Sequence, residues 1–485
     1  MHPARRSVNW GQHSIPAFPV WAASGKPFAL MFVCAVCHYA LDDDLRVPAS
    51  AMSRFSRDVL HLNLPHWDER EGVCRDCLER FTHARSRVGL YLPTPGGVTL
   101  PKFKILPTPL RLGASPRYTG RGVTIAFLDS GFYPHPDITQ PVNRILHYHS
   151  VLTRRADLAE LATPDDSSWH GLMTSVVAAG NGFQSRGLYR GIASSAKLVL
   201  VKVGTTRRIY HDDIRRGLDW VYRHRHRFGI RIVNISCGGD YEASYLTDPL
   251  SQAAERLVKA GVVVVAASGN AGHQREHPVL PPASAPSVIA VGGFDDKNTL
   301  DPNEHDVYHS SYGVTVDGLQ KPEIIAPSIW IAAPILPGTP TAQQAALYEQ
   351  LSRAPDGELR AILAQHTGID AELDAAAHLE PYQLRLLVEG KMRNEKVISG
   401  HYKHVDGTSF AAPIVSSIVA QMLEVNPRLT PQQVKRILIR TARRLPNIEA
   451  DRQGWGVVNA RLAVAAALNG GDILPSGHDF HLNGL

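Results

Sequence analysis

Three short segments carry side chains whose types can combine in one reaction. They are FLDSGF with Asp129, WHGLMTS with His170 and DGTSFAAP with Ser409. A serine hydroxyl is a poor nucleophile at neutral pH, and it attacks a carbonyl efficiently only when an imidazole takes its proton. The imidazole in turn needs a carboxylate that holds its tautomer and stabilises its protonated form. The three types together therefore indicate nucleophilic catalysis by serine.

Each segment alone is weak evidence, because Asp-Ser-Gly is typical of a turn, His-Gly of a loop and Gly-Thr-Ser of a helix start. The elements around them make the combination specific. Asp129 ends the predicted strand Val123–Asp129, His170 precedes a helix of small apolar residues, and Ser409 opens the predicted helix Gly407–Val425. Strand ends and helix starts meet at the carboxyl edge of a parallel sheet, where α/β folds build their sites.

Short apolar runs alternate with helical patterns from Gly122 onward. Because these runs are apolar on both faces, they predict parallel strands covered by helices on both sides. The fold class is therefore α/β, with a doubly wound, mostly parallel sheet. The expected strands are residues 123–129, 198–203, 230–236, 262–267 and 287–293, and the expected helices are 211–228, about 250–260, 407–425 and 429–442.

Composition divides the chain into four parts. Residues 1–105 form an N-terminal module, Pro/Gly-rich residues 106–115 a linker, residues 116–470 the catalytic domain, and residues 471–485 a tail. Amphipathic helices at about 340–395 interrupt the α/β alternation and read as an insertion. Both ends of this insertion must return close to the Ser409 segment, so we expect it near the rim of the cleft.

The three motifs, in this order, resemble those of the subtilisin-like serine proteases (the subtilase superfamily). The resemblance covers about residues 116–337 and 400–468. It extends beyond the catalytic segments to RIVNISCGG, VVVVAASGNAG, PASAPSVIAVGG, KPEIIAPSIWI and GWGVVNA. It implies a subtilisin-like fold and a serine endopeptidase that acts on polypeptides.

The resemblance also implies individual roles. Asp129 orients the imidazole, His170 acts as general base and then acid, and Ser409 is the nucleophile. Asn270 donates to the oxyanion together with the Ser409 N–H. The residues themselves agree, since Asn270 directly follows a buried strand and Ser-Gly, although Gly-Asn alone is typical of a turn. Calcium is implied by the family only, because no acidic loop here points to a site.

Substrate binding is implied for two segments, with the residues Ser236, Cys237, Gly238, Ala267, Ser268 and Gly269. Leu280 is expected to reach the primary specificity pocket and to make it narrow and apolar. The chain departs from the usual family pattern at Leu172 and Phe410, neither of which removes a catalytic group. Cys237 stands where an aliphatic residue is common; it reads either as a reactive thiol or as a small buried side chain.

Four of the five cysteines form two CxxC pairs, Cys34 with Cys37 and Cys74 with Cys77. Two such pairs can close a tetrahedral Cys₄ shell around zinc, whose role would be structural because no position stays open for water. Local disulfides or a redox function are the alternatives. His38 is expected to stay outside the shell. No propeptide-like pattern precedes the catalytic domain, so the zinc module is expected to regulate, recruit or stabilise.

Composition sets limits on partners. The net charge of +6 over 485 residues is mildly basic, and the N-terminal module lacks aromatic–basic interleaving, so nucleic acid is an unlikely partner. No apolar run approaches the ~20 residues of a membrane span. The apolar run Pro27–Val36 lacks the features of a signal peptide. We therefore expect a cytoplasmic enzyme with no membrane association, and a protein partner at the N-terminal module or the insertion.

Two other functions compete with this interpretation. A pseudoprotease would bind peptides without cutting them, but the chain retains Asp129, His170, Ser409 and Asn270. A zinc-dependent binding protein would use residues 1–105 as its main functional part. Turnover of a casein-type substrate distinguishes the first alternative from the protease, and metal analysis with a binding screen of residues 1–105 addresses the second.

Overall fold

The computed structural model describes residues 104–470, except 154–157, 164, 206 and 275, and separate short stretches between residues 31 and 100. By its internal contacts the chain divides into two compact units, residues 1–82 and residues 83–485. The tail predicted at 471–485 lies outside the described residues. The smaller elements of the larger unit are β5 Leu92–Pro93, β6 Thr99–Leu100, α4 Pro136–Thr139, α5 Leu158–Ala162, β14 Gly313–Val314, β15 Gln320–Lys321 and α15 Ala450–Gln453.

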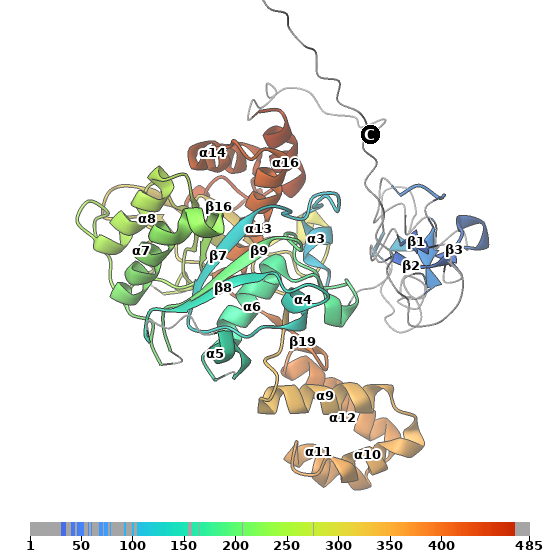
Figure 1. Cartoon of the computed structure of the whole chain (residues 1–485). Coiled ribbons are helices and arrows are strands. Elements are labelled where there is room, and N and C mark those ends of the chain that lie inside the picture. The colour runs from blue at the N-terminus through green and yellow to red at the C-terminus, as the bar shows by residue number, and fades with distance from the viewer. Residues whose placement is uncertain are drawn as a thin grey trace, which may run out of the picture. The chain divides into compact units, whose positions relative to one another are not determined.

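An eight-stranded sheet forms the centre of the larger unit (Figure 1), in the order β13–β12–β11–β10–β7–β9–β8 with β16 beside β12. All its pairs are parallel except β12 with β13. The predicted parallel sheet is thus confirmed. The strands are β7 Thr124–Asp129, β8 Ile145–Ser150, β9 Lys197–Lys202, β10 Ile230–Ile235, β11 Val263–Ala267, β12 Ile289–Asp295, β13 Asp306–Val307 and β16 Ile324–Pro327.

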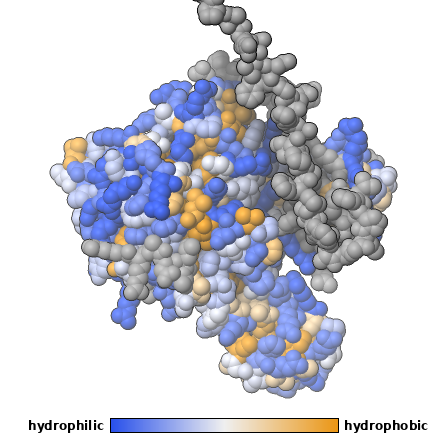
Figure 2. Space-filling model, in the orientation of Figure 1, coloured by the Kyte–Doolittle hydropathy of each residue, from blue (hydrophilic) through white to orange (hydrophobic). Residues whose placement is uncertain are grey.

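Helices cover both faces of the sheet, each over a separate apolar core. Successive residues of β7 point into different cores. Ile125 and Phe127 belong to one core, and Ala126 and Leu128 belong to the other. This alternation explains why the strand is apolar throughout. Figure 2 shows polar residues over the outer surfaces of α7 and α8. One face carries α6 Ser168–Ala179, α13 Thr408–Val425, α14 Pro431–Thr441 and α16 Ala460–Leu468, and the other α7 His211–Phe228 and α8 Pro249–Lys259.

Helix α13 runs through the core. In the described part of the chain it is the one helix with the length and apolarity of a membrane span, and 83% of that window is buried inside the protein. It contacts α6, α16 and five strands of the sheet. Its apolar character is therefore accounted for by burial in the protein core.

The predicted insertion consists of helices between β17 Ile331–Pro334 and β18 Val397–Ser399. These strands flank β19 Tyr402–Val405 in a three-stranded antiparallel sheet. The helices enclose an apolar core of their own and form a lobe (Figure 1). They are α9 Pro340–Arg353, α10 Leu359–Gln365, α11 Ala371–Ala375 and α12 Pro381–Asn394. Both ends of the insertion thus return to β19, the strand that leads into Gly407–Ser409.

The segment predicted as a linker, residues 106–115, contains a short helix. This segment forms helix α3 Thr108–Arg111, and its flanks bury Leu106 and Leu112 against the larger unit. Pro107 and Pro109 lie at the start of this helix and do not interrupt it, because proline is tolerated in the first helical turn. The apolar side chains on either side of this helix, Leu106 and Leu112, then pack onto the rest of the larger unit.

The smaller unit contains two short antiparallel strand pairs, β1 Met31–Val33 with β2 Ala40–Asp42 and β3 Arg46–Val47 with β4 Val73–Cys74. They surround a small core that includes both described cysteines of the CxxC pairs. Its buried members are Phe32, Cys34, Ala49, Met52, Leu60, Trp67, Val73 and Cys74.

Candidate active site

The site begins with a carboxylate–imidazole pair. Asp129 is the last residue of β7, at the point where the chain passes from β9 on one side of this strand to β10 on the other. His170 lies in the first turn of α6, and its Nδ1 is 2.7 Å from Asp129 Oδ1. The Asp129 side chain is 1% exposed and that of His170 19%. A switch point at the carboxyl ends of the strands is where open α/β sheets bind ligands.

Two neighbours hold Asp129 that the sequence analysis did not identify. The Ser130 N–H donates to Oδ1 at 2.8 Å and the Thr174 hydroxyl to Oδ2 at 3.0 Å. Thr174 lies four residues after His170, so its position on the same helix face was the available signal. Gly171 permits the close approach of α6, since a Cβ there would lie 2.0 Å from the Gly131 carbonyl oxygen.

The environment of the His170 ring controls its protonation. Burial opposes the charged form, but the adjacent Asp129 carboxylate outweighs burial through its charge and its hydrogen bond. The pKa of His170 is therefore raised above its ordinary value.

We expect a pH–rate profile that reports this shift. A general base works only when neutral, so kcat/KM should fall as the pH drops through the raised pKa of His170, with a midpoint above about 6.5. Initial rates on a peptide substrate between pH 5 and 9, at constant ionic strength, measure it. A profile that stays flat down to about pH 5 would contradict this prediction.

Ser409 is the second residue of α13, directly after Gly407 and Thr408. Gly407 has a φ of +133°, which disfavours any residue with a Cβ. Pro413 lacks an N–H, so the Ser409 carbonyl, four residues earlier, has no donor from its own helix. Ser236 Oγ donates to that carbonyl at 2.8 Å, and Ser409 Oγ donates to the Ser236 carbonyl at 3.1 Å. The end of β10 thus holds the serine from both sides.

The imidazole and the serine segment are neighbours. The His170 ring lies 5.9 Å, between centroids, from the ring of Phe410, the residue after Ser409. In the described residues the Ser409 hydroxyl bonds to Ser236 rather than to His170. Catalytic hydrogen bonds often form fully only when substrate is bound.

Asn270 follows β11, and its side chain contacts Thr408, the residue before Ser409. Its Oδ1 accepts from the Thr408 N–H at 2.9 Å and from the Thr408 hydroxyl at 3.0 Å. Because both Thr408 groups donate to it, this atom must be the amide oxygen, and the amide nitrogen Nδ2 remains available to donate a hydrogen bond. A Cβ built on Gly407 would lie 3.7 Å from Asn270 Nδ2 and 3.8 Å from Ser409 N. The side-chain amide of Asn270 and the backbone N–H of Ser409 therefore lie next to the same position, beside Gly407.

The two segments predicted to bind substrate differ in whether their backbone groups make hydrogen bonds. Within the described residues, the backbone groups of Cys237 and Gly238, beyond the end of β10, make no hydrogen bond. By contrast, Ser268 N donates to Val291 O, and Gly269 O accepts from Ser311 N. The first segment is the one with a backbone edge available to an extended chain.

Two side chains beside this edge were singled out from the sequence. Leu280 is half-buried, and a Cβ on Gly238 would lie 3.9 Å from Leu280 Cβ, so Leu280 adjoins the unpaired edge. Cys237 is half-buried and packs on the core beneath α7 and α8. Burial, and then the Asp129 carboxylate, raise the pKa of the Cys237 thiol well above its ordinary value, which disfavours the reactive thiolate.

The predicted metal ligands are only partly described. Cys34 and Cys74 are buried together, and the Cys74 N–H donates to Cys34 Sγ at 3.3 Å. Cys37 and Cys77 lie outside the described residues. Among the residues that are described, no group of three or more potential ligands gathers into a metal site.

A carboxylate–imidazole pair beside a serine at a helix start, on a parallel α/β sheet, defines the class of serine hydrolases. The chain belongs to the subtilase family, whose model matches residues 120–456. It is a subtilisin-like serine endopeptidase.

Curated relatives support this assignment. The chain is 30% identical over 359 residues to "Serine protease AprX" of Bacillus subtilis, which covers 71% of this chain and 67% of AprX. It is 30% identical over 213 residues to "Subtilisin BL" of Lederbergia lenta, covering 44% of this chain and 65% of that protein. Among solved structures, fervidolysin from Fervidobacterium pennivorans aligns with a TM-score of 0.51 at 20% identity, over 76% of this chain and 46% of that one. The last comparison shows the fold alone.

Proposed function

We propose that this endopeptidase cleaves peptide bonds through an acyl-enzyme on Ser409. The observation that carries the proposal is the 2.7 Å contact between His170 Nδ1 and Asp129 Oδ1 beside the Ser409 segment. Turnover of a casein-type substrate, blocked by a serine-directed phosphonate, tests it.

The chemistry follows from this geometry. The Ser409 hydroxyl exchanges the Ser236 carbonyl for His170 Nε2, gives its proton to that nitrogen and attacks the scissile carbonyl. Asp129 keeps the proton on Nδ1 and stabilises the imidazolium. The imidazolium then protonates the leaving amine, and water hydrolyses the ester with His170 again as base. The Ser409 N–H at the start of α13 and Asn270 Nδ2 donate to the tetrahedral oxyanion.

The proposed substrate is an extended polypeptide. Its backbone pairs with the free groups of Cys237 and Gly238 as an added strand, which selects for unfolded segments rather than for a sequence. The residue before the scissile bond enters a pocket bordered by Leu280, which favours small apolar side chains. A peptide-library cleavage profile, run on the full chain and on a chain without residues 1–105, identifies this preference and any effect of the N-terminal module.

Asn270→Ala is expected to lower kcat by about 10²–10³-fold with little change in KM, because the amide acts on the oxyanion and not on the ground-state substrate. Steady-state kinetics on a peptide substrate measure both constants. Asn426→Ala is a matched control, since Asn426 also uses both ends of its amide, toward Ala467 O and Arg428 N, at the far end of α13. A change in Asn270→Ala confined to KM would contradict the role.

We propose that the N-terminal module holds one structural zinc ion on Cys34, Cys37, Cys74 and Cys77. Two observations support the fit: Cys34 and Cys74 meet in a small core, and the Cys74 amide donates to Cys34 Sγ, as suits a thiolate. Zinc would cross-link the two CxxC pairs and so stabilise the fold of the module, and it would take no part in hydrolysis.

Metal analysis of the purified full chain is expected to find about one zinc per molecule. Cys34→Ser and Cys74→Ser should each lose most of it, because three thiolates bind zinc less tightly than four. Cys237→Ser is the control, since this cysteine belongs to the larger unit. Equal zinc content in all variants, or none in the wild type, would refute the site.

A further inference from the structure

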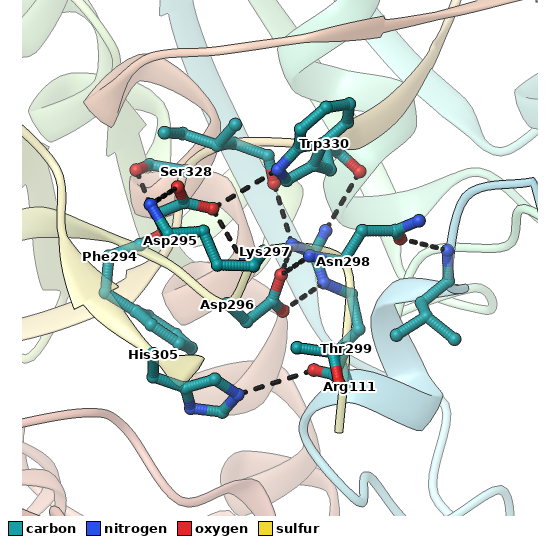
Figure 3. A network of polar contacts seen from close by, with 12 residues as sticks. Arg111, Phe294, Asp295, Asp296, Lys297, Asn298, Thr299, His305, Ser328 and Trp330 are labelled. Carbon is teal, nitrogen blue, oxygen red and sulfur yellow. Dashed lines mark hydrogen bonds and ion pairs between the residues drawn. The ribbon is translucent and has the colours of Figure 1, made fainter. Parts of the chain in front are cut away.

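A buried ion pair ties the start of the larger unit to its sheet (Figure 3). Arg111, the last residue of α3, binds both oxygens of Asp296, with Nε 2.5 Å from Oδ2 and Nη2 2.5 Å from Oδ1. The two side chains are 0% and 2% exposed. A charge this deeply buried needs a partner, so neither residue is expected to keep its place without the other.

The same guanidinium also holds a second segment. Nη2 donates to the Ile329 carbonyl at 2.7 Å and Nη1 to the Trp330 carbonyl at 2.9 Å (Figure 3). Arg111 thus makes four hydrogen bonds, two to a carboxylate and two to the chain between β16 and β17. The planar fork of arginine suits this arrangement, which the point charge of lysine cannot reproduce.

The segment that Arg111 holds includes a residue, Trp330, with an unfavourable backbone conformation that its contacts must stabilise. Trp330 has a φ of +62°, the left-handed region that a bulky residue avoids. Its Nε1 donates to Asp295 at 3.2 Å, and its ring packs 4.8 Å, between centroids, from His404 of β19. With the Arg111 bond to its carbonyl, three contacts keep this residue in place.

This segment is in direct contact with the serine loop. The Ser328 carbonyl, one residue before Ile329, accepts from the Gly407 N–H at 2.8 Å. Gly407 separates the end of β19 from Thr408 and Ser409, and it adjoins both N–H groups proposed to bind the oxyanion. The path from Arg111 to the nucleophile therefore consists of one bonded segment, residues 328–330, and one further hydrogen bond.

We propose that Arg111, paired with Asp296, is a positioning residue for the nucleophile: by holding residues 328–330 it sets the place of Gly407, and with it Ser409 and the oxyanion donors. The proposal rests on the function proposed for Ser409. Arg111 precedes the matched family region, residues 120–456, so a segment outside that region contributes to the working geometry of the site.

The test separates positioning from stability. In Arg111→Met/Asp296→Leu both buried charges leave together, so no unpaired charge remains and the apolar side chains fill similar space. The carbonyls of residues 329 and 330 nevertheless lose their donors. Arg111→Lys keeps a positive charge without the fork. Arg231→Met is the matched control, because Arg231 also donates to two backbone carbonyls, those of Pro427 and Leu429, at the opposite end of β10.

Measurements on the full chain are kcat and KM with a fluorogenic peptide, the rate of labelling by a serine-directed fluorophosphonate, and Tm. We expect the double variant to keep a Tm near that of the wild type while kcat and the labelling rate fall about tenfold or more and KM changes little. For Arg111→Lys, kcat and the labelling rate should lie between those of the wild type and the double variant. Arg231→Met should keep both within about twofold of the wild type.

A double variant with wild-type kcat and labelling overturns the proposal, as does a loss confined to KM. If the double variant does not fold, Arg111→Lys, assayed well below its Tm, decides: wild-type kcat and labelling overturn the proposal, and lowered values support it. Ser409→Ala is measured in the same assays as a control for the proposed function. Turnover that persists in Ser409→Ala refutes the proposed function itself, whatever the Arg111 variants do, whereas an inert Ser409→Ala with unaffected Arg111 variants refutes only the positioning role.

Discussion

Ser409→Ala is expected to lower kcat by at least about 10⁴-fold and to abolish labelling by a serine-directed phosphonate. The substitution removes the hydroxyl and leaves the surroundings intact, because Ser236 Oγ still donates to the carbonyl of residue 409. The remaining rate would come from substrate binding and from the oxyanion donors, which still stabilise the tetrahedral oxyanion that forms when water attacks the carbonyl directly. Single-turnover kinetics on a fluorogenic peptide, with mass spectrometry of the labelled protein, measure both effects.

Ser417→Ala is the matched control for this substitution. Ser417 is buried in the same helix, two turns further on, and its hydroxyl donates to the Ile414 carbonyl of its own helix. It is expected to keep full labelling and a kcat close to that of the wild type. Undiminished hydrolysis by Ser409→Ala would mean that another group is the nucleophile and that the acyl-enzyme mechanism is wrong.

Asp129→Asn is expected to lower kcat by about 10⁴-fold with a small effect on KM. Asparagine keeps the size of the side chain but loses the charge that stabilises the imidazolium, and it no longer requires Nδ1 to carry the proton. The raised pKa of His170 should then return toward its ordinary value or below, since burial alone opposes protonation. A pH–rate profile of the variant therefore has its acid limb shifted to lower pH, which simple destabilisation does not produce.

The chain supplies a control for this prediction. Asp248 and His211 form a second buried pair, with the same 2.7 Å contact between a carboxylate oxygen and a ring nitrogen. Asp248→Asn should cost comparable stability but leave kcat within a few-fold of the wild type, because this pair lies outside the proposed triad. Equal losses of kcat in the two variants would show that Asp129 acts only through folding.

Local patterns were sufficient for most elements of the sheet. Helix 211–228 was predicted with the bounds of α7, and the strands ending near Asp129 and before Asn270 came within one or two residues of β7 and β11. Such elements are readable because burial imposes a period of 3.6 on helices and continuous apolarity on covered parallel strands. Strand β8 was missed because ILHYHS, at the edge of the sheet, is neither continuously apolar nor regularly alternating, and only its first, fourth and sixth residues are buried.

The candidate site was readable for a related reason: a nucleophile, a base and an oxyanion donor must each have a particular residue type, whatever the spacing. By contrast, only the tertiary structure decided which residues support them. The contacts of Ser236 with Ser409, and of Arg111 with Asp296 across 185 residues of sequence, leave no local signature, and Thr174 is marked only by its helical spacing from His170. The sequence by itself determined the elements and the reactive groups, since these depend on residue type and periodicity. The order of strands in the sheet determined the contacts between distant segments, and with them the geometry of the site.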